Sequence, residues 1–176
     1  MSLNIDDFKE RLVGGGARPN LFRAFIQWPS GVIGADTSLV SFMCKAAQLP
    51  GSTMGIIPVP FRGRQLKIAG DRTFDPWTVT IINDTDFQVR NAMERWMNYI
   101  NAHVTNTGET NPSAYQTDLK VEQLDKDETV LNTYRFVGSF PTAVSPIDVS
   151  YEAVDAIEEF SVEFQYQYWT NAQSTS

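Results

Sequence analysis

The clearest structural signal in this sequence is Phe160-Ser161-Val162-Glu163-Phe164-Gln165-Tyr166-Gln167-Tyr168. Apolar and polar side chains alternate through all of it. Successive side chains of a β-strand point to opposite faces of the sheet, so a period of two gives one apolar face and one polar face. The segment predicts a strand that packs one side on a core and turns the other side to water.

Shorter segments predict the other strands of a β domain. The same alternation is shared by residues 76–82, 132–136 and 22–28. Residues 37–46 and 115–124 are rich in β-branched and aromatic side chains between turn signals, which favours two further strands. Residues 125–128, Asp-Lys-Asp-Glu, join the second of these to the next strand as a hairpin turn.

One segment has strong helical periodicity. Apolar residues recur at spacings of three and four from Phe87 to Ile100, after a capping-box pattern over residues 85–88. We therefore expect an amphipathic helix over about residues 86–101. A short helix over residues 5–12 is also expected, before three consecutive glycines interrupt it.

Several strands, one long helix and no alternating βαβ pattern predict a mainly β protein. We expect an antiparallel β-sandwich or barrel with one flanking α-helix (about 86–101) and a long loop or hairpin (51–70). The 176 residues suit a single domain, with residues 1–16 as an N-terminal arm and residues 170–176 as a flexible polar tail. Residues 51–70 are too long for a passive connection, which indicates a functional segment or one that a partner orders.

Composition excludes several protein classes. With 42% hydrophobic and 20% charged residues, the chain is not an intrinsically disordered protein, a collagen-like repeat or a disulfide scaffold. The net charge of −7 has the wrong sign for tight binding to DNA phosphates. Residues 1–100 carry a net charge of +2 and residues 101–176 carry −9, which suits copies that meet head to tail. An acidic start and no long apolar run predict synthesis in a cytoplasm and no membrane segment.

Few residues could perform catalysis. His103 is the only histidine, and its place after the helix favours a cap on the last carbonyls over a general base. Cys44 is the only cysteine, and we expect a buried, inert thiol. Asp71 and Asp75 flank Arg72, which favours an arginine–carboxylate tie over a catalytic pair. With no zinc or calcium pattern either, the sequence predicts neither an enzyme nor a cofactor.

Four sequence blocks together resemble one protein family. The blocks are Ala17-Arg18-Pro19-Asn20-Leu21-Phe22, Phe42-Met43-Cys44-Lys45-Ala46 with Leu49-Pro50, Ile57-Pro58-Val59-Pro60-Phe61, and residues 68–80 (IAGDRTFDPWTVT) with Asn83-Asp84. Their order and spacing over residues 17–101 resemble the tail tube protein of contractile-tailed (myovirus-type) bacteriophages. Residues 134–169 fit the family in their strand pattern. The family shares its fold with the inner tubes of type VI secretion systems and extracellular contractile injection systems.

The resemblance implies a structural protein of the virion tail that is assembled in the host cytoplasm. Six copies are expected to close a ring, and rings to stack into a tube through which genomic DNA passes without tight binding. The implied partners are other copies of the chain, the sheath protein, the baseplate tube proteins and the tape-measure protein. An alternative is the inner tube of a type VI secretion or injection system that delivers protein effectors. An enzyme or carbohydrate-binding β domain would instead be a monomer or dimer with a pocket.

The resemblance also gives roles to particular residues. We expect polar strand residues to line the lumen, namely Glu159, Glu163, Gln165 and Gln167. Basic residues of the 51–70 segment are expected to contact the next ring or an adjacent subunit, namely Arg62, Arg64 and Lys67. Three residues of the strongest block are expected to hold the turn between that segment and the next strand, namely Asp71, Arg72 and Trp77.

Overall fold

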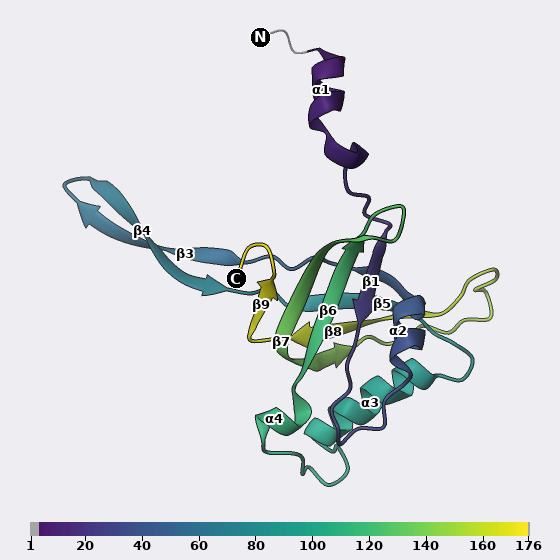
Figure 1. The fold of residues 1–176 in the computed structure, drawn as a ribbon. Coiled ribbons are helices and arrows are strands. Elements are labelled where there is room, and N and C mark those ends of the chain that lie inside the picture. Colours follow the sequence, from purple (N-terminus) through teal and green to yellow (C-terminus); the bar gives the residue numbers. More distant parts are fainter. Residues whose placement is uncertain (1–3, 176) are drawn as a thin grey trace.

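The computed structural model describes residues 4–175 and has a main sheet of seven antiparallel strands (Figure 1). Six of them lie in the order β1-β6-β7-β8-β5-β2, and β9 also pairs with β7. Their bounds are β1 (Phe22–Phe25), β2 (Cys44–Ala47), β5 (Trp77–Ile82), β6 (Thr117–Leu124), β7 (Val130–Val144), β8 (Glu159–Gln165) and β9 (Tyr168–Asn171). The expectation of a mainly β, antiparallel sandwich is confirmed.

The long strand β7 belongs to both halves of the sandwich. Its first part pairs with β6 and β9, and its last part pairs with β8. Gly138 lies between the two parts with φ +64°, a conformation that side chains disfavour. The carboxylate of Asp118 accepts a hydrogen bond of 3.1 Å from the backbone N–H of Gly138. Strand β7 changes pairing partners at this irregular point.

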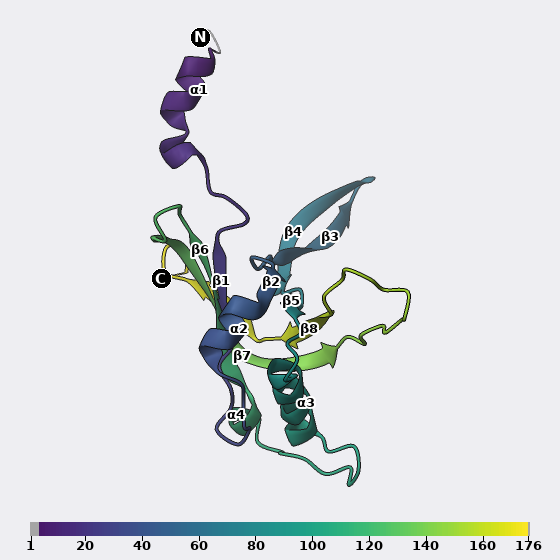
Figure 2. The same ribbon diagram turned by 90° about the vertical axis from the view of Figure 1, so that its right-hand side faces the viewer.

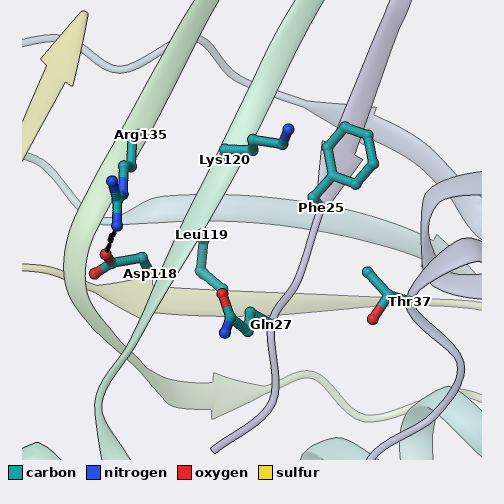
Figure 3. A pocket seen from close by; sticks show the side chains of 7 residues that line it. All are labelled: Phe25, Gln27, Thr37, Asp118, Leu119, Lys120 and Arg135. Carbon is teal, nitrogen blue, oxygen red and sulfur yellow. Dashed lines mark hydrogen bonds and ion pairs between the residues drawn. The ribbon is translucent and has the colours of Figure 1, made fainter.

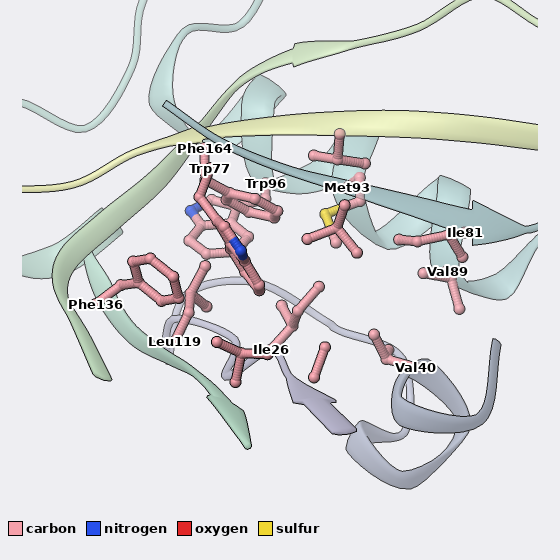
Figure 4. Close-up of a cluster of buried hydrophobic side chains, with 14 of the residues drawn as sticks. Ile26, Val40, Trp77, Ile81, Val89, Met93, Trp96, Leu119, Phe136 and Phe164 are labelled. Carbon is pink, nitrogen blue, oxygen red and sulfur yellow. The ribbon is translucent and has the colours of Figure 1, made fainter. Parts of the chain in front are cut away.

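Aromatic side chains fill the space between the sheet layers (Figure 4). Trp77 of β5 stacks on Phe136 of β7 with ring centroids 4.4 Å apart. Trp96 comes from helix α3 (Gln88–Ile100), is fully buried and donates a hydrogen bond of 2.8 Å to the carbonyl oxygen of Tyr115. The apolar face of β8 points into the same core through Phe160, Val162 and Phe164, as the alternation predicted.

The predicted long helix is confirmed, but its predicted cap is wrong. Residues 84–87 form a turn that leaves Phe87 in the left-handed region with φ +53°. Asp84 then accepts a hydrogen bond of 3.2 Å from the backbone N–H of Gln88, so its carboxylate takes the place expected for Thr85.

Residues 37–43 form a helix where a strand was predicted. Helix α2 spans Thr37–Met43, and the side chain of Asp36 caps it by accepting a hydrogen bond of 2.9 Å from the N–H of Ser38. Strand β2 begins only at Cys44. A short apolar run such as this one is compatible with a strand or with a helix, and the cap at Asp36 stabilises the helix.

The remaining short helices lie at the edges of the body. They are α1 (Ile5–Arg11), the 3₁₀ turn Val13–Gly15 and α4 (Pro112–Tyr115). Helix α1 stands well away from the sheets (Figure 1) and buries none of its residues. None of the helices in residues 4–175 has the length and hydrophobicity needed to cross a membrane.

Two strands lie outside the main sheet. Strands β3 (Thr53–Phe61) and β4 (Arg64–Thr73) pair only with each other and project from the body (Figures 1 and 2). The segment expected as a loop or hairpin is thus a hairpin. At the other end of the chain, Thr170 and Asn171 pair with Arg135 and Tyr134 in β9, so a polar tail starts two residues later than expected.

Candidate assembly surfaces

The β3–β4 hairpin, here residues 51–73, has an apolar face with no partner in the described chain. Cross-strand neighbours on one face of an antiparallel pair share that face. On this face the residues are Ile57, Val59 and Phe61 opposite Ile68, Leu66 and Arg64. Every residue of β3 is exposed, and Phe61 and Leu66 near the tip are 67% and 61% exposed. Water therefore covers five large apolar side chains in the isolated subunit.

The hairpin tip holds an arginine in an unfavourable backbone conformation. Arg62 and Gly63 form the two-residue turn with φ +44° and +80°. Such a turn favours asparagine, aspartate or glycine at its first position, and arginine is an uncommon choice. The guanidinium carbon of Arg62 lies 5.4 Å from the ring centre of Phe61, within the range of a cation–π contact.

The expected contact residues of the hairpin are exposed charges. Arg62, Arg64 and Lys67 all lie on its surface, and Arg72 adds a fourth positive charge nearer the base. None of the five ion pairs found within residues 4–175 involves the hairpin. The structure brings these residues together on the hairpin, and none of them forms an ion pair with another residue of the described segment 4–175.

Two tryptophans hold the segment that leads into the hairpin. Trp77 donates a hydrogen bond of 2.7 Å from its indole N–H to the carbonyl oxygen of Gln48. Trp169 of β9 donates one of 3.2 Å to the carbonyl oxygen of Gly51.

The expected tie at Arg72 is wrong. Asp71, Arg72 and Asp75 are exposed, and Arg72 makes no ion pair in the part of the chain that the structure describes. Strand β4 continues to Thr73, so Asp71 and Arg72 lie in a strand where a turn was expected.

The polar face of β8 is continuous with that of its neighbour β5. Glu163 lies opposite Thr78 and Ser161 opposite Thr80, while the alternate residues are buried. Glu159 and Gln165 share the face with Glu163 by the period of two. Gln167 falls between β8 and β9, where its backbone N–H donates to the carbonyl oxygen of Val137 over 3.0 Å. Three of the four expected lumen residues therefore share one face, and Gln167 lies beyond it.

Neighbouring groups moderate the charge of this face. The ammonium group of Lys45 lies 2.5 Å from the carboxylate of Glu159, and both side chains are partly exposed. Glu163 makes no ion pair within residues 4–175, and within those residues its carboxylate accepts only a long hydrogen bond of 3.4 Å from Thr142. Glu163 is therefore the expected lumen residue whose negative charge is least compensated.

Sequence reasoning missed the loop of residues 145–158, between β7 and β8. Four of its side chains are both large and highly exposed, namely Val149, Tyr151, Val154 and Ile157. It also carries four acidic residues and no basic residue, namely Asp148, Glu152, Asp155 and Glu158. The loop surrounds a hollow of about 350 Å³ with both apolar and acidic walls. Clustered acids among unpatterned apolar residues were the only sequence signal.

A second hollow lies on the outer face of β1, β6 and β7 (Figure 3). Its volume is about 450 Å³, and its wall includes the ion pair of Arg135 with Asp118. Lys120 lies 4.3 Å from the ring centre of Phe25 and 2.8 Å from a carboxylate oxygen of Glu122. The lining residues include neither histidine nor cysteine, and the charges are already paired. This surface lacks the free acid, base or nucleophile of an active site.

The single histidine and cysteine do not form a site. His103 makes no hydrogen bond within the described residues, and the Tyr99 carbonyl near the helix end accepts the N–H of Glu109 over 3.1 Å, so the predicted histidine cap is wrong. Burial raises the pKa of the Cys44 thiol to about 11, which keeps it protonated at neutral pH. No cluster of potential metal ligands is found among residues 4–175.

Comparison with known proteins matches the whole body of the chain to one family. The family model described as phage tail tube protein matches residues 17–172. The chain is 32% identical over 167 residues to the tail tube protein gp19 of Enterobacteria phage T4, covering 94% of this chain and 98% of that protein. It is 30% identical over 165 residues to the tail tube protein of Serratia phage KSP90, covering 92% and 93%.

Solved structures of contractile injection systems share the fold at low sequence identity. A chain of the anti-feeding prophage cap, described as a tube-terminating cap, superposes over all of both chains with a TM-score of 0.66 and 17% identity. A chain of an extracellular contractile injection system sheath–tube complex superposes with a TM-score of 0.65 and 13% identity, over 93% of this chain and 95% of that one. The chain belongs to the phage tail tube protein family, whose members are structural proteins of the virion tail and not enzymes.

Proposed function

We propose that this protein is the repeating subunit of the inner tube of a contractile phage tail. Six copies of the single domain, residues 1–176, close a ring, and the rings stack into a tube whose polar, acidic lumen conducts viral DNA during ejection. The observation that carries the proposal is the unpartnered apolar face of the β3–β4 hairpin.

The energetics of the hairpin favour a partner outside the chain. A two-stranded hairpin alone is at best marginally stable in water. Fully burying one large apolar side chain stabilises by about 1.5–3 kcal/mol, and the hairpin exposes five of them on one face. The projecting position leaves that face accessible to a neighbouring copy (Figure 2). We therefore infer that the hairpin lies at a subunit interface. Its basic residues Arg62, Arg64 and Lys67 contact the next ring or an adjacent subunit there.

The polar face of β8 and β5 suits the wall of a water-filled channel. One side of the sheet is committed to the core, and the other presents hydroxyl, amide and carboxylate groups. Glu163 and Gln165 face the lumen in this arrangement, with Glu159 and Gln167 nearer its margins. Carboxylates repel DNA phosphates, so the genome slides along the wall without binding tightly.

The phage tail is favoured over a secretion or injection tube. The relatives at 30–32% identity are phage tail tube proteins, whereas the injection-system chains share the fold at 17% identity or less. We therefore infer a virion component assembled in the host cytoplasm. Its partners are the sheath protein around the tube, the baseplate tube proteins on which the tube starts, and the tape-measure protein.

Sedimentation and electron microscopy of the purified chain test the proposal. A six-membered ring of 19.8 kDa subunits has a mass of about 119 kDa. The expected result is rings of that mass, or tubes of stacked rings, once concentration or a tube fragment supplies a nucleus. A chain that stays monomeric in the presence of tube fragments, or that closes rings with another symmetry, contradicts the proposal.

A further inference from the structure

We propose that the β3–β4 hairpin of one copy docks on the loop of residues 145–158, the acidic loop, of a second copy. This inference rests on the proposed function, since it names the partner of the hairpin in the assembled tube. It assigns a role to the acidic loop that neither the core nor the polar face of β8 requires.

The two segments have opposite charge. The hairpin carries four basic residues, three of them near its tip, and one acidic residue, Asp71. The acidic loop carries four acidic residues and no basic residue. No ion pair within residues 4–175 involves either segment. Complementary charges guide encounter and fix the register of two surfaces.

Several other acids in the C-terminal half already have partners. In the β6–β7 turn, hydrogen bonds from the side chain and then the N–H of Thr129, the latter 3.0 Å long, lower the pKa of the Asp127 carboxyl, and Lys126 precedes it in the chain. Asp118 is paired with Arg135, and Glu122 with Lys120 and Arg23. The acidic loop is therefore the largest group of acids without a cation of its own.

Both segments also expose apolar surface. In the acidic loop, Val149 is 80% exposed and Val154 77% exposed, and these values are even higher than for the apolar residues at the hairpin tip. Exposed apolar surface of this extent on a polar background marks an interaction site. Charge alone would give a weak contact, so shared apolar burial supplies the rest of the affinity.

The hollow of about 350 Å³ within the acidic loop fits the chemistry of the hairpin tip. Its apolar walls come from side chains such as Val149, Ala153 and Ile157, and its acidic groups are Asp148, Glu158 and Glu159. At the tip, the aromatic ring of Phe61 and the guanidinium group of Arg62 lie together. The ring and the methylene stem of Arg62 can enter the apolar part while the charged group stays at the acidic rim.

The positions of the two segments require two copies. The hairpin projects from one side of the body, and the acidic loop, drawn in yellow-green between β7 and β8, projects from the opposite side (Figure 1). They cannot meet within one chain. A contact between unlike surfaces of identical subunits repeats head to tail, and it produces closed rings or extended stacks.

A charge exchange tests the pairing, with tube growth measured by pelleting and electron microscopy. The hairpin variant R62E/R64E and the loop variant D148K/E152K, which changes an acid of the hollow, are each expected to slow tube growth at least about tenfold, because each places like charges across the contact. Combining all four changes restores the attraction and is expected to recover most of the growth. The control D86K/E128K makes the same change in net charge at exposed acids outside the loop and is expected to grow normally.

The outcomes separate this inference from the proposed function. If wild-type tubes grow and R62E/R64E blocks growth, while D148K/E152K grows normally, the hairpin has another partner and only this inference falls. Failure of the fourfold variant to recover, with melting temperatures equal to that of the wild type, also overturns it. If the wild-type chain forms no rings or tubes, both the inference and the proposed function are wrong.

Discussion

The indole N–H of Trp77 donates a 2.7 Å hydrogen bond to the carbonyl oxygen of Gln48, 29 residues earlier in the chain. Trp77 is fully buried, and its ring stacks on Phe136. One face of this side chain thus belongs to the core, while its polar edge holds the segment that enters the hairpin. The block that most resembled the tail tube family places its tryptophan at this junction.

Replacing Trp77 with phenylalanine is expected to lower the free energy of unfolding by about 2–4 kcal/mol. The smaller ring leaves a cavity, and the carbonyl of Gln48 loses its donor. Urea unfolding followed by circular dichroism measures the change. Trp169→Phe is the matched control, because the half-buried Trp169 makes a similar hydrogen bond to Gly51 and is expected to cost about 1 kcal/mol. Equal losses in the two variants would show that the core position of Trp77 is unimportant.

Arg62→Asn is expected to leave thermal stability unchanged or slightly raised, while weakening tube growth. Asparagine tolerates the positive φ of this turn position, so the hairpin keeps its shape while it loses the side chain proposed to contact a neighbouring subunit and that side chain's cation–π contact with Phe61. Thermal unfolding and pelleting assays measure the two effects separately. Arg62→Lys keeps the charge and serves as the control. Normal tube growth by the asparagine variant would remove Arg62 from the interface.

Reversing charge on the polar face of β8 is expected to make tubes retain DNA. Glu163→Lys with Gln165→Lys adds two cations per subunit to the proposed lumen, and repetition around each ring multiplies their effect on phosphates. Glu159 is left unchanged, because a lysine there would face Lys45. DNA retained by purified tubes at several salt concentrations is the measurement, with Glu163→Gln as a charge-neutral control. DNA binding no stronger than that of the parent tube would place the lumen elsewhere.

The Cys44 thiol is expected to react slowly in the folded protein. Its pKa of about 11, raised by burial from 9.0, leaves a thiolate fraction at pH 8 that is about 100-fold smaller than in the unfolded chain. Iodoacetamide labelling at pH 8, with and without urea, compares the two states. Because the folded pKa is the higher one, this group's contribution to stability is complete below pH 9 and declines as the pH rises toward 11. Equal labelling rates in both states would mean that the thiol is accessible and ionised normally.

Strong periodicity explains what the sequence could predict. The alternation that starts at Phe160 identified β8 with its buried and wet faces, but the predicted strand is too long, because β8 ends at Gln165 and the exposed Tyr168 begins β9. The spacing of apolar residues from Phe87 to Ile100 identified α3. Both signals arise because only one face of each element is buried, so apolar residues recur with the period of the backbone, two in a strand and 3.6 in a helix. The hairpin followed from length and composition, since twenty residues rich in proline and glycine rarely serve as a passive connection.

Local polar contacts explain what it could not predict. The residues of α2 read as a strand because β-branched and aromatic side chains are common there, and a single cap at Asp36 reversed the outcome. The first N–H of α3, that of Gln88, bonds to Asp84 and not to Thr85, because the turn over residues 84–87 brings the Asp84 carboxylate to the start of the helix. The apolar residues of the acidic loop, residues 145–158, follow no regular period, so the sequence did not show that they are exposed and not buried in the core. Such features depend on tertiary placement, which a local pattern does not contain.

The long-range pairing of the sheet also sets an order of events during synthesis. Arg23 of β1 pairs with Glu122 of β6, which the ribosome adds 99 residues later, and Trp169 follows its acceptor Gly51 by 118 residues. The β3–β4 hairpin, by contrast, is held by contacts between residues close in the sequence, which form fastest. The local contacts of the hairpin can therefore form long before the rest of the body closes, although the hairpin alone is at best marginally stable. The hydrogen bond from the Trp169 indole to Gly51 forms only when the final strand leaves the ribosome. A chain truncated before Trp169 would keep the hairpin but lose one of the two indole hydrogen bonds, to Gln48 and Gly51, that hold its base.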